Sequence, residues 1–332
     1  MIEDALIVVG LFHLMQKYVH IVVRNLKNIK LFFIFFTIHF DFFLIIVYIS
    51  CCDYKIMILF DNHLHLREDG RFLEAVKDFK NAGGTHFILC QLPMVNKVII
   101  DRTYEKCYDI TLRMADRIRS EIDIGIFITL APYPVDYIKL KNKFGRLKAI
   151  EIMKKGIDLA IKFCEEKKSV AIGEIGRPHF NVDEQTITDS NHLLLYAMER
   201  AADIEVPIVL HTESTTHENC KEFVKMGEKV GLPPYKIIKH FSPPFIYENE
   251  NYGLMPSILA SRKNIEIAFK KGTRFLMETD YIDDPFRPGA VLGPKTVPKR
   301  TLYLLENGII TEEQIYKVHQ ENPEKIYDIS LE

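Results

Sequence analysis

The sequence predicts a (β/α)8 barrel over residues 57–332, preceded by a hydrophobic extension over residues 1–56. From Met57 onward, short apolar runs alternate with longer amphipathic stretches, which is typical of βα units. Such a barrel needs about 250 residues, and this part of the chain is long enough to supply them. A doubly wound sheet is the alternative, but no G-x-G-x-x-G motif follows the first strand to favour it.

The extension contains a run of residues, 31–52, that is long enough to cross a bilayer as a helix. Only His39 and Asp41 interrupt the run, and several basic residues precede it. If the run is a membrane anchor, this charge distribution leaves the N-terminus in the cytosol. It is too long for a cleaved signal peptide. The alternatives are an upstream start chosen wrongly, with Met57 as the natural beginning, or an extra buried element. We expect a cytoplasmic protein unless the anchor is genuine.

The elements of the barrel follow one another in order. The expected strands are 57–66, 85–93, 122–132, 169–176, 206–214, 235–244, 253–261 and 273–281, of which 253–261 is the least distinct. The expected helices are 70–82, 101–120, 147–167, 186–203, 217–230, 262–271, 296–307 and 311–320. This gives the rhythm of a parallel sheet whose strands are connected by helices.

The overall composition is that of a globular protein, and it limits the partners. The net charge of −2 argues against a broad surface for nucleic acid, so binding of that kind would have to be local. The 6 cysteines form no C-x-x-C pair and no regular spacing. Neither a zinc knuckle nor a disulfide framework is therefore indicated, and reduced thiols are expected.

Residues 59–66 read LFDNHLHL and place two histidines on one strand. Side chains alternate along a strand, so Asp61, His63 and His65 are expected to share one side. Further polar residues end the later apolar runs, and in this type of barrel the strand ends gather at one face. These residues are Glu174, His211, His240 and Asp280.

Each of these residues also has a structural interpretation. A single histidine at a strand end is commonly a hydrogen-bonded core residue, and Asp280 could cap a loop or helix. Glu174 follows an apolar strand and needs a partner if it is buried, which could be a metal ion or Arg177. The gathering of all these residues at one barrel face favours a metal site.

The order H-x-H, G-E-I-G, His on strand five, His on strand six and E-T-D on strand eight resembles the TatD-like metal-dependent hydrolases of the amidohydrolase superfamily. The resemblance covers residues 57–332. It implies two divalent metal ions, with Glu174 bridging them; one ion would be held by His63, His65 and Asp280, the other by His211 and His240. Nitrogen and oxygen ligands without thiolate suit Zn, Mn, Fe, Co or Ni, with Mg as a weaker option.

The implied chemistry is hydrolysis by activated water. Asp280 is the expected catalytic acid–base residue. Glu278 and Asp61 are expected to support the ligands from behind or to have a purely structural role.

The sequence differs from that of the DNA-acting members of that family in the segments expected to contact substrate. Those members follow strand four with G-L-D and an aromatic residue, where this chain has residues 176–180, GRPHF, and they carry H-C-F-S-G where this chain has residues 240–244, HFSPP. Arg177 and His179 lie beside Glu174 in the sequence, and Arg287 lies on the long last loop. They are expected to meet an anionic substrate, although a solvated loop is the alternative for the cations.

Several functions fit this pattern. The first is a hydrolase of phosphoesters that acts on a nucleic acid end or a small phosphodiester. The second is a hydrolase of C–N or C–O bonds, such as a lactonase, cyclic amidase or deaminase. The third is a non-catalytic metal-binding or membrane-tethered interaction protein, which is disfavoured because no expected ligand is replaced. A barrel with metal ligands does not separate these functions.

Overall fold

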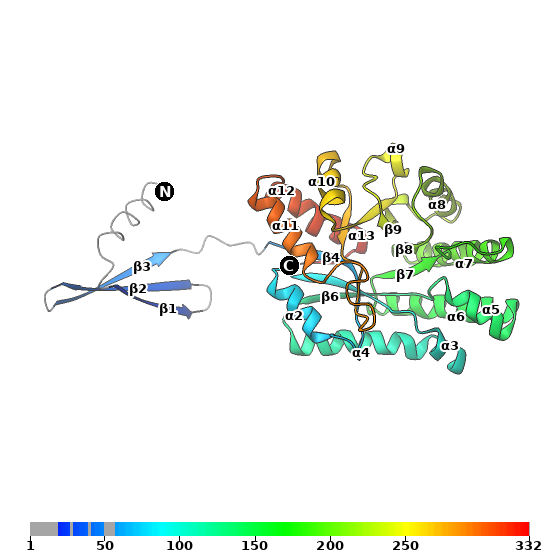
Figure 1. The fold of residues 1–332 in the computed structure, drawn as a ribbon, viewed down its shortest axis with the longest axis horizontal. Coiled ribbons are helices and arrows are strands. Elements are labelled where there is room, and N and C mark those ends of the chain that lie inside the picture. Colours follow the sequence, from blue (N-terminus) through cyan, green and yellow to red (C-terminus); the bar gives the residue numbers. More distant parts are fainter. Residues whose placement is uncertain (1–18, 27–28, 39–40, 50–56, 332) are drawn as a thin grey trace. The chain divides into compact units, whose positions relative to one another are not determined.

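The computed structural model describes residues 19–26, 29–38, 41–49 and 57–331. The chain divides into two units, Met1–Met57 and Ile58–Glu332 (Figure 1). In the first unit, β1 (Val19–Leu26), β2 (Ile29–Ile38) and β3 (Asp41–Ile49) form an antiparallel sheet. The described part of the hydrophobic run 31–52 is thus extended, and the rest of the extension lies outside the described residues. Among the residues that the structure describes, no helix combines the length and the hydrophobicity needed to span a membrane.

The second unit is built on a 9-stranded sheet in the order β11-β10-β9-β8-β7-β6-β5-β4-β12. Apart from the ends, neighbours in the sheet are consecutive in the chain, and all pairs are parallel. The strands are β4 (Phe60–His65), β5 (His86–Cys90), β6 (Gly125–Leu130), β7 (Ala171–Gly176), β8 (Ile208–His211), β9 (Ile237–Ser242), β10 (Met255–Leu259), β11 (Leu276–Glu278) and β12 (Tyr281–Ile282).

The last two strands are pieces of one interrupted strand, and they close the barrel. β11 pairs with β10, whereas β12 pairs with the first barrel strand, β4. In the interruption, the Asp280 amide donates to the His63 carbonyl at 2.9 Å. The Asp61 carboxylate also spans this seam, because it accepts from the Thr279 amide at 3.0 Å and from the Thr279 hydroxyl at 2.7 Å. The predicted (β/α)8 barrel is therefore confirmed.

Helices follow the strands and pack on the outside of the barrel (Figure 1). They are α2 (Leu73–Asn81), α3 (Val95–Asp101), α4 (Glu105–Glu121), α5 (Asp136–Phe144), α6 (Arg146–Glu165), α7 (Glu184–Asp203), α8 (His217–Lys229), α9 (Glu248–Asn251), α10 (Arg262–Lys271), α11 (Thr296–Glu306), α12 (Glu312–Tyr316) and α13 (Asn322–Tyr327), with a 3-10 turn η1 (Pro234–Lys236) and a π turn η2 (Lys317–Glu321).

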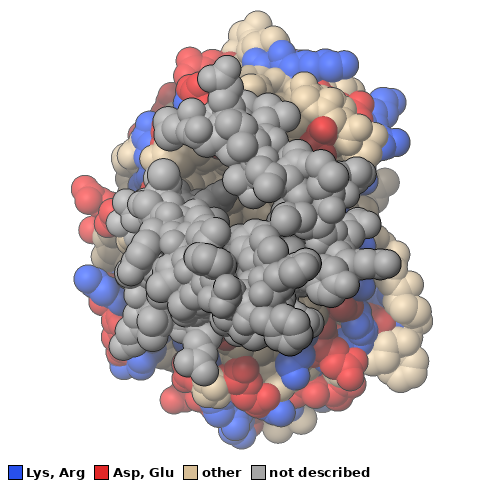
Figure 2. Space-filling view, turned by 90° about the vertical axis from the view of Figure 1, so that its left-hand side faces the viewer, with Lys and Arg blue, Asp and Glu red and all other residues tan. Residues whose placement is uncertain are grey.

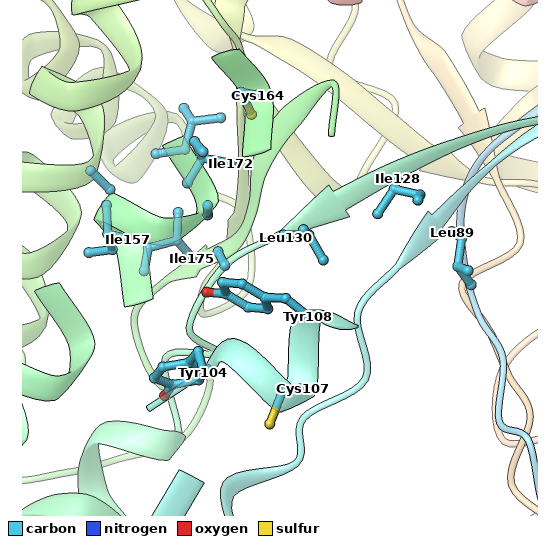
Figure 3. Packing of buried hydrophobic residues seen from close by; sticks show 14 of the residues in the cluster. Leu89, Tyr104, Cys107, Tyr108, Ile128, Leu130, Ile157, Cys164, Ile172 and Ile175 are labelled. Carbon is cyan, nitrogen blue, oxygen red and sulfur yellow. The ribbon is translucent and has the colours of Figure 1, made fainter. Parts of the chain in front are cut away.

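Alternation along the strands divides the apolar core into two layers. Leu89, Ile128 and Ile172 belong to one cluster with helix residues such as Tyr108 of α4, which lies close to Leu130 (Figure 3). Residues of the other parity, such as Ile88 and Cys90, belong to a separate cluster inside the barrel. Because both strand faces are covered, the strands are apolar on both sides, as parallel strands usually are. The described cysteines, Cys90, Cys107, Cys164 and Cys220, are buried and free, while Cys51 and Cys52 lie outside the described residues.

The element predictions were wrong mainly at short helices. The sequence analysis missed α3, α5 and α9, and it ended the last helix too early. α3 reads VNKVIID, in which β-branched residues weaken the helical signal. α5 and α6 are separated by Gly145 at φ 83°, a conformation that glycine adopts easily and that ends one helix before the next begins.

Candidate metal centre

The polar residues predicted from the strand ends converge at the C-terminal face of the barrel. His63 and His65 lie on β4, Glu174 on β7 and His240 on β9, and all four are buried. Asp280, which is 7% exposed, lies in the interruption between β11 and β12. Its φ of 48° is uncommon for a residue other than glycine. The closure of the barrel therefore brings Asp280 next to the histidines of the first strand.

One group of ligand atoms comes from His63, His65 and Asp280. The two Nε2 atoms lie 3.1 Å apart. They lie 3.9 Å (His63) and 3.7 Å (His65) from Asp280 Oδ1. Two ligands of one tetrahedral zinc ion, each bonded at about 2.0–2.1 Å, are about 3.3 Å apart. The spacing of these three side chains thus fits a single divalent ion.

A second group comes from His63, Glu174 and His240. Glu174 Oε1 lies 3.7 Å from His63 Nε2 and 3.6 Å from His240 Nε2. The same oxygen lies 2.8 Å from His211 Nδ1, and Oε2 lies 3.5 Å from His65 Nε2. Glu174 thus faces every histidine of the predicted centre. His211 is absent from both groups but contacts Glu174 directly.

His63 provides a separate test of whether a metal fits. Its Nδ1 is buried and has no hydrogen-bond partner among the described residues. Burial, together with the neighbouring His240, holds the pKa of His63 well below its usual range. A neutral imidazole with its Nε2 directed at carboxylates is suited to bind a cation. The residues present therefore fit a divalent metal ion.

Glu278, which is expected to support the ligands from behind or to have a purely structural role, lies next to His240. Its Oε1 is 3.0 Å from His240 Nδ1 and accepts from the Phe241 amide at 2.8 Å, while its other oxygen accepts from the Ser257 hydroxyl. Although burial opposes ionisation, His240 holds the pKa of Glu278 at about 2. Burial lowers the pKa of His240, but Glu278 and Asp280 outweigh it and raise the value to about 9. Glu278, 3.0 Å from Nδ1, is placed to hold the orientation of the His240 ring.

A family comparison matches this barrel as a whole. The model described as "TatD related DNase" covers residues 60–328. The chain belongs to the TatD-related DNase family. It is also 42% identical over 275 residues to "Uncharacterized protein MJ1127" of Methanocaldococcus jannaschii, a match that covers 82% of this chain and 96% of that protein.

Solved structures support the TatD-like fold. The TatD homologue YJJV of Escherichia coli is similar with a TM-score of 0.59 at 16% identity, covering 82% of this chain and 99% of that one. A mutant organophosphorus hydrolase gives a TM-score of 0.56 at 12% identity, covering 82% and 93%. These identities are too low to carry function, so the two structures show the shared fold.

The three residues predicted to bind substrate in this TatD-family protein differ from one another in their surroundings. Arg177 is buried and donates to Glu213 at 2.7 Å and to Glu222 at 2.8 Å, so its guanidinium is occupied by carboxylates. Arg287 lies on the surface with its Nε 2.8 Å from Asp284 Oδ2. His179 reaches the centre, because its Nδ1 lies 2.9 Å from His211 Nε2. Arg177 contacts His211 through its backbone amide, at 3.0 Å from the His211 carbonyl, whereas His179 contacts the His211 ring with its side chain.

Asp61, which is expected to support the ligands or to have a purely structural role, makes its contacts at the barrel seam. Its carboxylate faces Thr279 and the His63 amide rather than the His63 ring. Burial raises the pKa of Asp61 to about 7. Asp61 therefore supports the centre through the backbone of the barrel seam.

Tyr133 is a site residue that the sequence analysis missed. It follows β6 and places its hydroxyl 3.0 Å from His211 Nε2. Its sequence signal is modest: an aromatic residue between two prolines at the end of an expected strand. Because Glu174 lies at the other ring nitrogen, Tyr133 and His179 complete the surroundings of His211.

Proposed function

We propose that this TatD-family protein is a metal-dependent hydrolase that uses a binuclear centre to cleave a phosphoester bond in a small substrate. The observation that carries the proposal is the convergence of three histidines and two carboxylates on shared ligand positions. Metal ions bound there would lower the pKa of water and stabilise negative charge on the reacting group. His63, His65 and Asp280 would hold one ion, and His211 and His240 the other, with Glu174 between them.

Asp280 is the proposed acid–base residue. Burial raises the pKa of Asp280 to about 7, and the neighbouring carboxylates of Glu278 and Glu174 act in the same direction. A carboxylate that lies beside the ligand atoms is suited both to accept a proton from water and to return it to a leaving group. The position of Asp280 among the ligands supports this role.

The charges around the centre favour a small substrate over a polymer. Arg177 and Arg287, the arginines expected to meet an anion, are paired with carboxylates. On the side of the barrel that faces left in Figure 1, Figure 2 shows Lys and Arg interspersed with Asp and Glu rather than gathered into one patch. Neutralising a nucleic acid backbone takes several unpaired cations along a track. The metal ions alone would suffice for a single phosphoryl group.

The second candidate is a hydrolase of a carboxylic ester or lactone. The same arginine pairing favours it, since such a substrate carries no charge that needs an arginine. The metal ligands and Asp280 would perform the same tasks at a carbonyl carbon.

The test uses the full-length chain loaded separately with Zn, Mn and Co. Turnover of bis(4-nitrophenyl) phosphate, a γ-lactone and a cyclic amide is measured together with metal content. We expect phosphodiester hydrolysis that is lost in His63→Ala/His65→Ala and kept in Arg287→Ala. Turnover of the lactone alone would favour the second candidate. Bound metal without turnover of any of these compounds would contradict both hydrolase proposals and favour a non-catalytic protein.

A further inference from the structure

A row of five aromatic rings crosses the metal centre. Ring centroids are 5.1 Å apart between Phe180 and His179 and also between His179 and His211. They are 5.8 Å apart between His211 and His240 and between His240 and Phe241. The inner members are residues of the centre, whereas the two ends are phenylalanines that are 47% and 50% exposed. Each end of the row is therefore an exposed apolar ring.

The backbone holds Phe241 in an unusual position. Its φ is 54°, a value that side chains larger than glycine rarely adopt. Its amide donates to the buried Glu278 carboxylate at 2.8 Å, which fixes this conformation. The same carboxylate positions His240, so the exposed ring and the metal ligand are set by one group.

Phe180 is tied to the centre through its neighbour. The His179 ring lies edge-on to both Phe180 and His211, at interplanar angles of 88° and 71°. Arg177, on the same loop, is held by Glu213 and Glu222 and stacks over the Phe223 ring at 4.5 Å. The loop after β7 thus exposes the Phe180 ring to solvent, while the Arg177 guanidinium of the same loop is paired with glutamates.

We propose that Phe180 and Phe241 form a binding subsite for an uncharged aryl or bulky alkyl group of the substrate, attached to the phosphoryl group at the metal centre. The proposal rests on the proposed function, because it places the reacting group at the metal ligands. Exposed single apolar side chains need no explanation, but two that end one row of rings through a metal centre match the walls of a ligand site. Aromatic rings at such a position bind other rings by offset or edge-to-face packing.

The experiment compares two non-hydrolysable ligands of equal charge, phenylphosphonate and methylphosphonate. Their dissociation constants are measured by calorimetry on the metal-loaded full chain. In the wild type, phenylphosphonate should bind about 10-fold more tightly, because a phenyl group buries more apolar area than a methyl group. The ratio should fall to about 1–2 in Phe180→Ala/Phe241→Ala, mainly through weaker phenylphosphonate binding.

Two further variants keep the result interpretable. Ile309→Ala removes a side chain that is 42% exposed between α11 and α12, and it should keep the wild-type ratio. Phe180→Leu/Phe241→Leu keeps apolar area without rings and should give an intermediate ratio. Metal content is measured for every variant, so that a loss of the centre is distinguished from a loss of the subsite.

The outcomes separate the two proposals. Binding of both phosphonates by the wild type at a ratio near 1 would overturn the subsite and leave the phosphoryl site intact. Binding of neither ligand by the metal-loaded wild type would overturn the proposed phosphoryl site, and the subsite with it. A wild-type preference that survives in the double alanine variant would assign the apolar group to other residues.

Discussion

His319 and His63 are both fully buried in this barrel, but their surroundings are opposite in kind. In the π turn η2, His319 places Nδ1 3.1 Å from both the amide nitrogen and the carbonyl oxygen of Phe60. Its Nε2 lies 2.9 Å from the Thr301 hydroxyl. By contrast, Nδ1 of His63 has no hydrogen-bond partner in the part of the chain that the structure describes, and its Nε2 faces another imidazole and two carboxylates.

The difference shows how a structural histidine is distinguished from a ligand. Buried polar atoms are normally satisfied by the protein, as those of His319 are. A buried nitrogen that faces other lone pairs is stable only if a proton or a cation lies between them. Burial alone therefore says little about a histidine, whereas the partners of its two nitrogens say a great deal.

The largest expected effects come from replacing each of these two histidines by alanine. One replacement should reduce activity and the other should reduce stability. His63→Ala is expected to lose metal and to lower kcat by at least about 10³-fold, since several kcal/mol of charge stabilisation depend on the ion. His319→Ala should keep metal content but lose about 2–3 kcal/mol of unfolding free energy, because the backbone and hydroxyl partners are left unpaired in the core. Elemental analysis, kinetics and urea unfolding measure these effects. The comparison fails if His63→Ala binds as much metal as the wild type.

Removing the metal should change the thermal stability of the two histidine variants to different extents. An ion present at 1,000 times its dissociation constant stabilises the folded state by about 4 kcal/mol. Chelation should therefore lower the Tm of the wild type and of His319→Ala, and leave that of His63→Ala almost unchanged. Thermal unfolding followed by circular dichroism, with and without EDTA, tests this. An equal response of all three proteins would show that the chelator acts elsewhere.

The pH dependence of stability should identify His319. Burial lowers its pKa to about 4. As the pH falls below about 6.5, the unfolded chain takes up a proton at this residue while the folded protein resists until about pH 4. The folded state loses stability across that window, by at most about 3 kcal/mol. Urea unfolding of the metal-free protein between pH 7.5 and pH 4.5 should show a smaller loss in His319→Gln than in the wild type; parallel curves would contradict the assignment.

The smallest expected effect concerns the support of His240. Glu278→Gln keeps the size of the side chain but removes the charge beside Nδ1, and such changes typically weaken metal binding about 10–100-fold. Competition with a chromophoric chelator measures the affinity. Asp284→Asn, which alters a carboxylate paired with Arg287 on the surface loop, is the matched control and should leave the affinity unchanged. Equal affinities in the wild type and Glu278→Gln would show that His240 needs no support.

The fold and the gathering of the ligands could be predicted because both depend on local pattern. His63, His65, Glu174, His240 and Asp280 each end an apolar run, and the parallel topology collects such ends at one face. Side-chain contacts between one βα unit and the next could not be predicted in this way. The pairing of Arg177 with Glu213 and Glu222 depends on how the loop after β7 packs against the loop after β8 and against α8.

Asp61 illustrates the same limit within one strand. Alternation puts Asp61 on the same side of the strand as His63 but does not name its partners, and the pairing of β4 with β5 is irregular between Asp61 and Leu64. The eighth strand is also interrupted, which leaves the Thr279 amide and hydroxyl available to Asp61. Neither irregularity has a signal in the local sequence.

The seam that Asp61 closes also dictates when the protein can acquire its centre during synthesis. The partners Asp61 and Thr279 are 218 residues apart, and His319 and Phe60 are 259 apart. Contacts at such separation form only after a large loss of chain entropy, and they tend to make folding slow. In a nascent chain, β4 therefore lacks its partner β12 on one side until most of the chain has been synthesised. During this time the exposed strand edge makes the incomplete chain prone to aggregation. We expect chaperones to be needed at this stage rather than after the barrel has closed.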